Sequence, residues 1–173
     1  LLRAKYPVLL VGQGAVGAAT LVRELAEHLG APVFSTASGR GVLPEDHVLA
    51  LGFDGERGNV TVVNELVAGS DLVLVLGCKL GFSGSLGFAL KLPSERVVRV
   101  DASEDVLHVT YPAKTAFVES VETFLKRVVP AIANCRGMHA SAWKKDEIAR
   151  WARRLRKPTV DVPEPAVQGT ETG

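Results

Sequence analysis

Residues 9–20 have the sequence LLVGQGAVGAAT, an apolar run followed by three glycines in the spacing Gly12-x-Gly14-x-x-Gly17. This spacing is typical of the turn between the first strand and the first helix of a dinucleotide-binding fold. There the first glycine permits a tight turn, the second lets the backbone approach a pyrophosphate, and the third lets the helix pack closely on the strand. A helix that starts near Ala15 adds free N–H groups and the positive end of its dipole. The motif therefore predicts a nucleotide-binding turn after the first strand.

The second predicted strand lacks the acid that NAD binding needs. In an NAD-binding fold, an Asp or Glu about 20 residues beyond the turn holds the ribose hydroxyls. Here that place is occupied by Phe34-Ser35-Thr36-Ala37, and Arg40, the nearest candidate for a 2′-phosphate, lies beyond a further glycine. A glycine turn without this acid argues against an ordinary NAD dehydrogenase.

Apolar runs alternate with helix-period segments along the rest of the chain. The expected strands cover residues 7–12, 31–36, 70–77, 96–102 and 115–120, and the expected helices cover 15–29, 59–69, 121–132 and 141–157. Short strands that are apolar on both faces are typical of a parallel sheet covered on both sides. The predicted fold class is therefore α/β: a doubly wound, mostly parallel sheet of five to six strands with helices on both faces. This is a Rossmann-like fold, similar to the NAD/FAD-binding fold type to which deoxyhypusine synthase belongs.

The composition describes an ordinary α/β protein. The 173 residues are 47% hydrophobic and 23% charged, and their net charge of +1 argues against nucleic-acid and membrane partners. The sequence has no apolar run near 20 residues and no signal peptide, and its two cysteines, Cys78 and Cys135, lie in no metal-ligand spacing, so we expect a reduced, cytoplasmic setting. It starts without an initiator methionine and ends in a Pro/Gly-rich stretch, so we expect a piece of a longer protein.

A strongly basic segment follows at residues 141–157. It carries seven Lys or Arg side chains and two acidic ones. Trp143, Glu147, Arg150 and Arg154 fall at helical spacing, and the apolar members are Trp143, Ile148, Trp151 and Leu155. One interpretation is a nucleic-acid-binding helix. The favoured one is a solvated helix that packs its two tryptophans on the domain or on a neighbour, because no aromatic stacking platform or base-reading motif accompanies it.

The stretch GAPVFSTASGRGVLPEDHVLALG, residues 30–52, is more specific. Its combination of a strand, Thr36, Gly39-Arg40-Gly41, a Pro-Glu-Asp-His run and a later glycine resembles the central domain of thiamine-diphosphate-dependent enzymes. That family includes acetolactate synthase, pyruvate oxidase, benzoylformate decarboxylase and oxalyl-CoA decarboxylase. Three later stretches resemble the family in the same order, namely GSDLVLVLGCKL (69–80), RVVRVDASEDVLHVTYP (96–112) and WKKDEIARWARRL (143–155). The resemblance extends from about residue 5 to residue 157.

The resemblance implies a nucleotide site along the strand ends. Flavin-bearing members of the family carry FAD there, and oxalyl-CoA decarboxylase places ADP there. Carried over residue by residue, the lining would be Gly12, Gln13, Gly14, Ser35, Thr36, Ala37, Phe53, Gly55, Gly77, Cys78, Lys79, Asp101 and Ala102. After Lys79, flavin members tend to have an acidic, arginine-bearing loop, whereas this chain has LGFSGSLGFAL. The missing arginine removes a phosphate partner, so FAD, ADP and an empty structural domain all stay open.

Individual residues near the site have competing interpretations. Gly39 and Gly41 suit a turn with positive φ. We expect His47 to be a hydrogen-bonded structural residue rather than a catalytic one, because no nucleophile or carboxylate pair is placed to use it. Lys79 would meet a phosphate or lie in a solvated turn. Asp101 would accept from an adenine or ribose, or else it (or its neighbour Ser103) would cap a helix.

The sequence lacks the Gly-Asp-Gly…Asn stretch with which the family holds thiamine diphosphate and Mg²⁺, since FDGERGN (53–59) has no glycine before its Asp-Gly. We therefore predict no catalytic and no metal-binding residue. The resemblance implies the central structural and nucleotide-binding domain (residues 1–135) of a carboligase or decarboxylase that acts on 2-oxo acids, followed by a basic linker helix (136–157) and a flexible linker or tail (158–173).

The reaction would belong to flanking thiamine-diphosphate-binding domains, in a homo-oligomer, and the segment itself would be inactive. The alternative is a free-standing NAD- or nucleotide-binding module, or an NAD-consuming enzyme related to sirtuins or deoxyhypusine synthase. A sirtuin would need paired Cys-x-x-Cys zinc ligands, which the sequence lacks.

Overall fold

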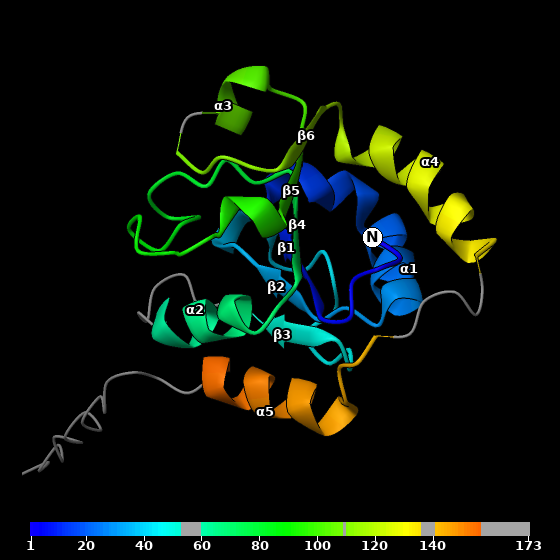
Figure 1. The fold of residues 1–173 in the computed structure, drawn as a ribbon, viewed down its shortest axis with the longest axis vertical. Helices are drawn as coiled ribbons and strands as arrows, with labels where there is room; N and C mark the ends of the chain where they lie inside the picture. Colours follow the sequence, from blue (N-terminus) through cyan, green and yellow to red (C-terminus); the bar gives the residue numbers. More distant parts are fainter. Residues whose placement is uncertain (53–59, 109, 136–140, 157–173) are drawn as a thin grey trace, which may run out of the picture.

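Six parallel strands form one sheet in the order β3-β2-β1-β4-β5-β6 (Figure 1). The computed structural model describes residues 1–52, 60–108, 110–135 and 141–156. The strands are β1 (Pro7–Val11), β2 (Val33–Ser35), β3 (Ala50–Gly52), β4 (Leu72–Leu76), β5 (Val97–Asp101) and β6 (Thr115–Val118). The predicted doubly wound parallel sheet is thus confirmed, and β3 is the strand that the sequence did not predict.

The sheet is built around its two most apolar strands. β1 and β4 pair in parallel from Pro7↔Leu72 to Val11↔Leu76. Every residue of β1 is buried, as are all residues of β4 after the first. Strands that are buried on both faces cannot alternate polar and apolar residues, which explains the continuous apolar runs in the sequence.

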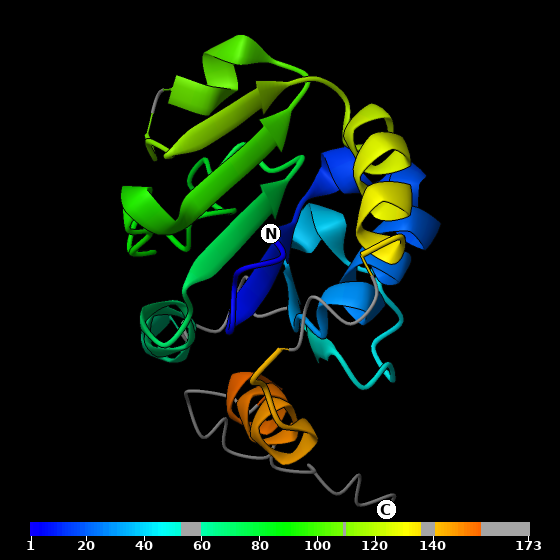
Figure 2. The same cartoon turned by 45° about the vertical axis from the view of Figure 1, so that its right-hand side comes forward.

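Helices cover both faces of the sheet. They are α1 (Ala19–Leu29), α2 (Val60–Ala68), α3 (Glu104–His108), α4 (Val121–Ala133) and α5 (Lys145–Arg156), with short 3₁₀ segments η1 (Gln13–Ala18), η2 (Ala37–Gly39) and η3 (Ser94–Arg96). α1 and α4 lie together on one face and α2 lies on the other, as Figure 2 shows. α3 packs beside β5 and β6.

Local signals set several helix ends. Gly30 ends α1 in the left-handed conformation, with φ 55°, as its place after the apolar stripe predicted. Ser120 caps α4, because its hydroxyl accepts the N–H of Thr123 at 3.1 Å. Pro130 lies inside the last turn of α4, which continues to Ala133. The helix predicted at 15–29 is divided, since η1 precedes α1.

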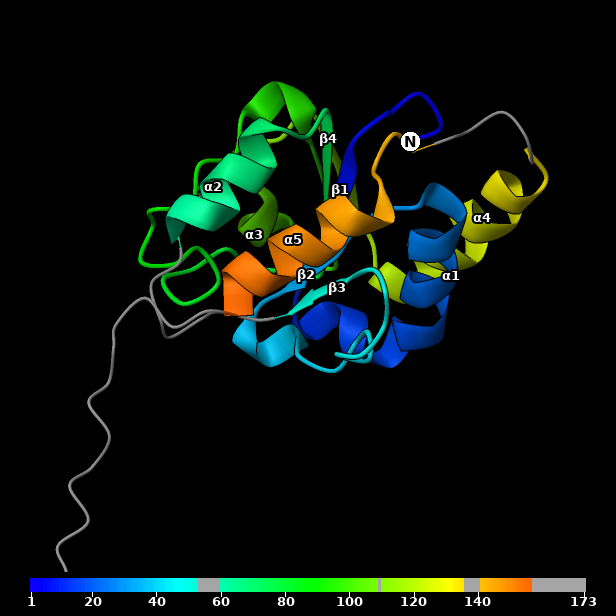
Figure 3. The same ribbon diagram turned by 90° about the horizontal axis from the view of Figure 1, so that it is seen from below.

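α5 packs along the open edge of the sheet, against β3 and α2 (Figure 3). Ile148, Ala152 and Leu155 form its buried face. Arg156 donates to the carbonyls of Glu45 (2.7 Å) and Ala50 (3.3 Å), in and just before β3. The basic helix therefore lies on the sheet with its apolar residues inward, while the domain limits at 135 and 157 stay a prediction.

Residues at the start of the chain are fastened to the segment that leads into α5. The N–H of Ala142 donates to the carbonyl of Lys5 at 2.7 Å. The indole N–H of Trp143 donates to the carbonyl of Pro7 at 2.9 Å, and its ring meets Tyr6 edge to face with centroids 5.1 Å apart. We call these contacts between residues 5–7 and 141–143 the clasp.

In the part of the chain that the structure describes, no helix is long and apolar enough to cross a membrane.

Candidate functional site

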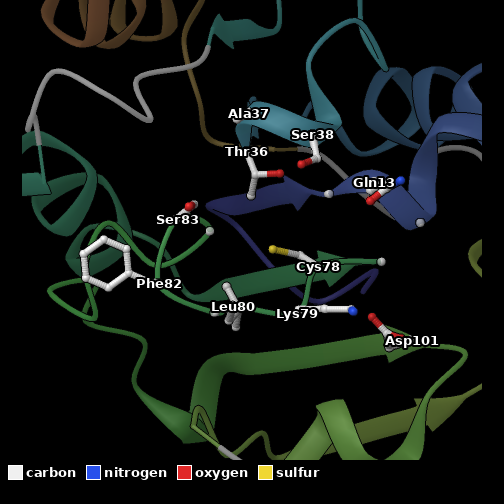
Figure 4. Close-up of a pocket in the computed structure, with 15 residues that line it drawn as sticks. Gln13, Thr36, Ala37, Ser38, Cys78, Lys79, Leu80, Phe82, Ser83 and Asp101 are labelled. Carbon is white, nitrogen blue, oxygen red and sulfur yellow. The ribbon is translucent and has the colours of Figure 1, made fainter.

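The loops that follow β1, β2, β4 and β5 enclose a cleft of about 500 Å³ (Figure 4). These loops lie at the carboxyl ends of the strands, next to the point between β1 and β4 where the strand order reverses. In open α/β sheets this switch point is the usual place for a ligand. We refer to this hollow as the carboxyl-edge cleft.

Most of the residues predicted for the nucleotide site come together here. Those that line the carboxyl-edge cleft are Gly12, Gln13, Gly14, Thr36, Ala37, Gly77, Cys78, Lys79 and Asp101. Ser35 is not among the lining residues, and its hydroxyl donates instead to the carbonyl of Gly52 at 3.5 Å. Ala102 is not among them either. Phe53 and Gly55 fall outside the described residues. The part these residues play in binding stays a prediction.

The glycine turn has a packing role that the motif did not predict. A Cβ on Gly12 would lie 2.4 Å from the carbonyl oxygen of Gly77, and one on Gly14 would lie 2.8 Å from the Cα of Gly77. Gly77 itself has φ +57°, and its own Cβ would meet Gly14. The two glycines therefore allow the loop after β1 to touch the loop after β4. Nothing lies within 4 Å of a Cβ on Gly17, so the close helix packing predicted for that glycine is wrong.

Three backbone donors of the turn are already engaged. The N–H of Gly12 donates to the carbonyl of Leu76 at 2.9 Å, that of Gly14 to Gly77 at 3.0 Å, and that of Ala15 to Gly12 at 3.1 Å. A pyrophosphate cradle requires N–H groups that point at the ligand. These three donors are not available for that purpose, contrary to the expectation from the motif.

The role predicted for Gly39 is also wrong. Its Cβ would lie 2.4 Å from the carbonyl oxygen of Val11, and its φ is not positive, so the residue serves a close approach between η2 and the end of β1. Gly41 does have the predicted positive φ, at 86°. The sequence thus located the turn but assigned one of its two glycines to the wrong physical cause.

The loop after β4 supplies residues that line the carboxyl-edge cleft and that the sequence analysis did not predict. Ser38, in η2, is a further such residue. From the loop after β4 come Leu80, Gly81, Phe82, Ser83 and Gly84. Three bulky residues in this stretch have positive φ, namely Leu80 (54°), Leu86 (55°) and Phe88 (61°). Phe82 and Phe88 are 71% and 53% exposed and meet edge to face, with centroids 5.9 Å apart. The only signal was the run of small and apolar residues in LGFSGSLGFAL, which does not specify such a backbone.

Two charged side chains of opposite sign line the cleft. Figure 4 shows the amine of Lys79 and the carboxylate of Asp101 directed toward one another, at the opposite end from Phe82. One oxygen of Asp101 accepts the N–H of Ser103 at 3.0 Å in a local turn just before α3, and both predicted roles of Asp101 stay predictions. Lys79 is exposed and so can reach a ligand anion.

A buried arginine supports the floor of the site. Arg99, on β5, is 1% exposed and donates to the carbonyls of Cys78 (3.2 Å), Leu107 (3.2 Å) and Tyr111 (3.0 Å). Burial lowers the pKa of this guanidinium, and burial likewise raises the pKa of the neighbouring Cys78 thiol. A thiol with a raised pKa is a poor nucleophile, so Cys78 acts here as a lining residue.

His47 is held by hydrogen bonds away from the cleft. Its Nδ1 accepts the N–H of Leu49 at 3.2 Å, so the ring proton lies on Nε2, which donates to the carboxylate of Glu27 at 3.1 Å. Hydrogen bonds, first from Arg23 and then from His47, lower the pKa of the Glu27 carboxyl. The predicted hydrogen bonding of His47 is confirmed, while its structural rather than catalytic role stays a prediction.

No group of His, Cys, Asp and Glu side chains that could hold a metal ion occurs within the described ranges.

A parallel sheet in the order 3-2-1-4-5-6 with a cleft at its switch point places the molecule in the class of Rossmann-like α/β domains. Comparison with known proteins narrows this class: residues 1–128 match the family described as "Thiamine pyrophosphate enzyme, central domain". The chain belongs to this family, as the sequence motifs predicted.

Similar proteins include large multi-domain enzymes. The chain is 31% identical over 129 residues to the acetolactate synthase isozyme 1 large subunit of Escherichia coli K12, covering 75% of this chain and 23% of that protein. It is 29% identical over 164 residues to the sulfoacetaldehyde acetyltransferase of Roseovarius nubinhibens, covering 88% and 26%.

A solved structure shares the fold: a protein assigned as a thiamin diphosphate-dependent enzyme from Mycobacterium smegmatis, with TM-score 0.56 and 27% identity, covering 75% of this chain and 25% of that one. The chain thus spans about a quarter of the length of these relatives.

Proposed function

We propose that the chain serves as the central domain of a thiamine-diphosphate- and Mg²⁺-dependent carboligase or decarboxylase that acts on 2-oxo acids, and that its carboxyl-edge cleft holds an adenine nucleotide, ADP or FAD. The observation that carries the nucleotide assignment is the position of the cleft, since four loops converge at the switch point of the sheet. The acetolactate synthase and acetyltransferase relatives support the reaction class.

The described residues do not fit thiamine diphosphate with its metal. No cluster of metal ligands lies among them, and the two charged groups of the cleft, Lys79 and Asp101, have opposite signs. The chemistry would therefore belong to flanking domains that bind the cofactor, in a cytoplasmic homo-oligomer, and this segment alone would turn over no 2-oxo acid. Release of CO₂ from pyruvate by the chain with thiamine diphosphate and Mg²⁺ would contradict this proposal.

The contacts that would hold a nucleotide follow from the polar groups of the carboxyl-edge cleft that can still bind a ligand. The N–H groups of Gly12, Gly14 and Ala15 are engaged, so the amine of Lys79 is the favoured partner of a phosphate. Asp101 has a second carboxylate oxygen that can accept a ribose hydroxyl. The cleft volume of about 500 Å³ lies within the usual range of small-molecule sites, about 300–1,000 Å³.

Isothermal titration calorimetry of the whole chain with ADP, FAD, NAD, and thiamine diphosphate plus Mg²⁺ tests the nucleotide site. We expect saturable binding of ADP or FAD and none of the other two. Lys79→Ala should weaken ADP binding about fivefold, because an exposed ion pair contributes up to about 1 kcal/mol. Lys91→Ala removes an exposed lysine outside the cleft and is the matched control. Binding of NAD alone would favour the NAD-consuming alternative and contradict the proposal.

A further inference from the structure

A second cleft, of about 370 Å³, lies at the opposite edge of the sheet from the proposed nucleotide site. Its lining residues come from the position before β1, the position after α2, the segment that leads into α5, and α5 itself. Figure 3 shows α5 beside α2 and β1. We propose that this amino-edge cleft binds a small aromatic carboxylate, whose ring packs on tryptophan and whose carboxylate pairs with Arg150.

Both tryptophans of the chain line this cleft. The sequence contains two tryptophans and two tyrosines, and both tryptophans and one tyrosine, Trp143, Trp151 and Tyr6, line this one cleft. Neither tryptophan is fully buried, and Tyr6 is 37% exposed. Both tryptophans pack partly against the core and leave part of each ring exposed, and half-exposed Trp and Tyr are enriched at binding surfaces.

The rings are held in place before any ligand arrives. Trp143 donates its indole N–H to Pro7 at 2.9 Å and meets Tyr6 edge to face, with an interplanar angle of 82°. The guanidinium of Arg154 lies 4.7 Å over the ring of Trp151 and pairs with Glu65 at 2.6 Å. A preorganised aromatic wall loses little freedom when a planar ligand binds.

Arg150 is the cation of this cleft that is placed to meet a ligand. Of the carboxylates in the described residues, Glu147 comes nearest to forming an ion pair with it, at 4.0 Å, the outer limit for such a pair. Glu147 is itself engaged, since it accepts the N–H of Lys144 at 3.0 Å at the start of α5. The side chain of Arg150 is 62% exposed. Its planar guanidinium can hold a carboxylate through two parallel hydrogen bonds.

The two tryptophans provide a direct readout. In a ¹H–¹⁵N spectrum of the whole chain the two indole N–H signals report on this cleft, and titration with phenylacetate should shift both of them saturably. Benzyl alcohol has the ring without the charge and should bind at least tenfold more weakly. The nucleotide titration involves other residues, so the outcome here is independent of the proposed function.

Matched arginine variants identify the charge that matters. Arg150→Ala should weaken phenylacetate binding about tenfold, whereas Arg153→Ala, which removes an exposed arginine of the same helix outside the cleft, should leave it unchanged. The absence of saturable indole shifts would overturn the inference. Equal weakening by both variants would indicate a general basic surface, and equal binding of benzyl alcohol would indicate a merely apolar patch; either result also overturns it.

Discussion

A pair of alanine substitutions within the glycine turn separates a packing role from a ligand role. In Gly12→Ala the new Cβ would lie 2.4 Å from the oxygen of Gly77 and 2.7 Å from the Cα of Cys78. Overpacking of this kind costs about 1–3 kcal/mol. The clash is with backbone, so relief requires the two loops to separate, and the hydrogen bond from Gly12 to Leu76, worth about 1 kcal/mol, weakens as well. We expect a total loss of about 3 kcal/mol.

Gly17→Ala should instead raise the free energy of unfolding. A Cβ at this position has nothing within 4 Å, and Gly17 lies in the 3₁₀ segment η1 without positive φ. Replacing such a glycine restricts mainly the unfolded chain, so the variant should gain about 0.5 kcal/mol in stability. Alanine substitutions at two glycines of one motif, five residues apart, would thus change the free energy of unfolding by amounts that differ by about 3.5 kcal/mol.

Urea-induced unfolding of the whole chain, followed by far-ultraviolet circular dichroism, measures both free energies of unfolding. The denaturant slope should be the same in wild type and variants, so that midpoints can be compared directly. If Gly12→Ala unfolds within about 1 kcal/mol of wild type, the loops are not in the tight contact described. If it keeps its stability and loses ADP binding, the glycine belongs to a phosphate cradle after all. A Gly17→Ala variant as unstable as Gly12→Ala would also refute the reasoning.

Three further outcomes follow from side-chain contacts. Arg99→Met removes the donor to three carbonyls, and at about 1 kcal/mol for each buried acceptor left unpaired it should lose about 3 kcal/mol in thermal or chemical unfolding; a loss near zero would mean that water replaces the guanidinium. Iodoacetamide at pH 8 should modify Cys135 well before Cys78, because Cys78 is 5% exposed and burial raises the pKa of its thiol; equal labelling rates by mass spectrometry would contradict this. Trp143→Phe keeps an aromatic ring beside Tyr6 but deletes the hydrogen bond to Pro7, so it should lose about 1 kcal/mol in urea unfolding, and an unchanged midpoint would show that the bond adds nothing.

The strands that the sequence predicted best are those whose environment is uniform. β1 and β4 are buried along almost their whole length, so their residues are apolar without interruption and the pattern is visible locally. β3 was missed because it is three residues long and depends on partners far away in sequence, β2 and α5. α3, with five residues, is likewise too short to show a helical period.

The sequence could predict those site residues that lie at the ends of strands. It could not predict features that depend on tertiary contacts of individual side chains. Carboxyl ends of neighbouring parallel strands meet at one edge, so Lys79 and Asp101 could be assigned to the site from their places at strand ends, whereas Thr36 and Cys78 were assigned from the family resemblance. The positive φ of Leu80 could not be foreseen, because it goes against the preference of that residue type and is imposed by tertiary contacts. Arg99 was counted as part of a strand, and its burial is offset by carbonyls 8 to 21 residues away.

The clasp has a mechanical consequence. Residues 5–7 and 141–143 are more than 130 positions apart, yet the hydrogen bonds from Ala142 to Lys5 and from Trp143 to Pro7 join them directly. Tension applied between Leu2 and the far end of α5 would load the contacts of α5 with β3 and α2 together with these two bonds. The hydrogen bonds between the six strands would carry little of the force. Under load α5 and the clasp should therefore separate from the domain while the sheet and the carboxyl-edge cleft keep their shape.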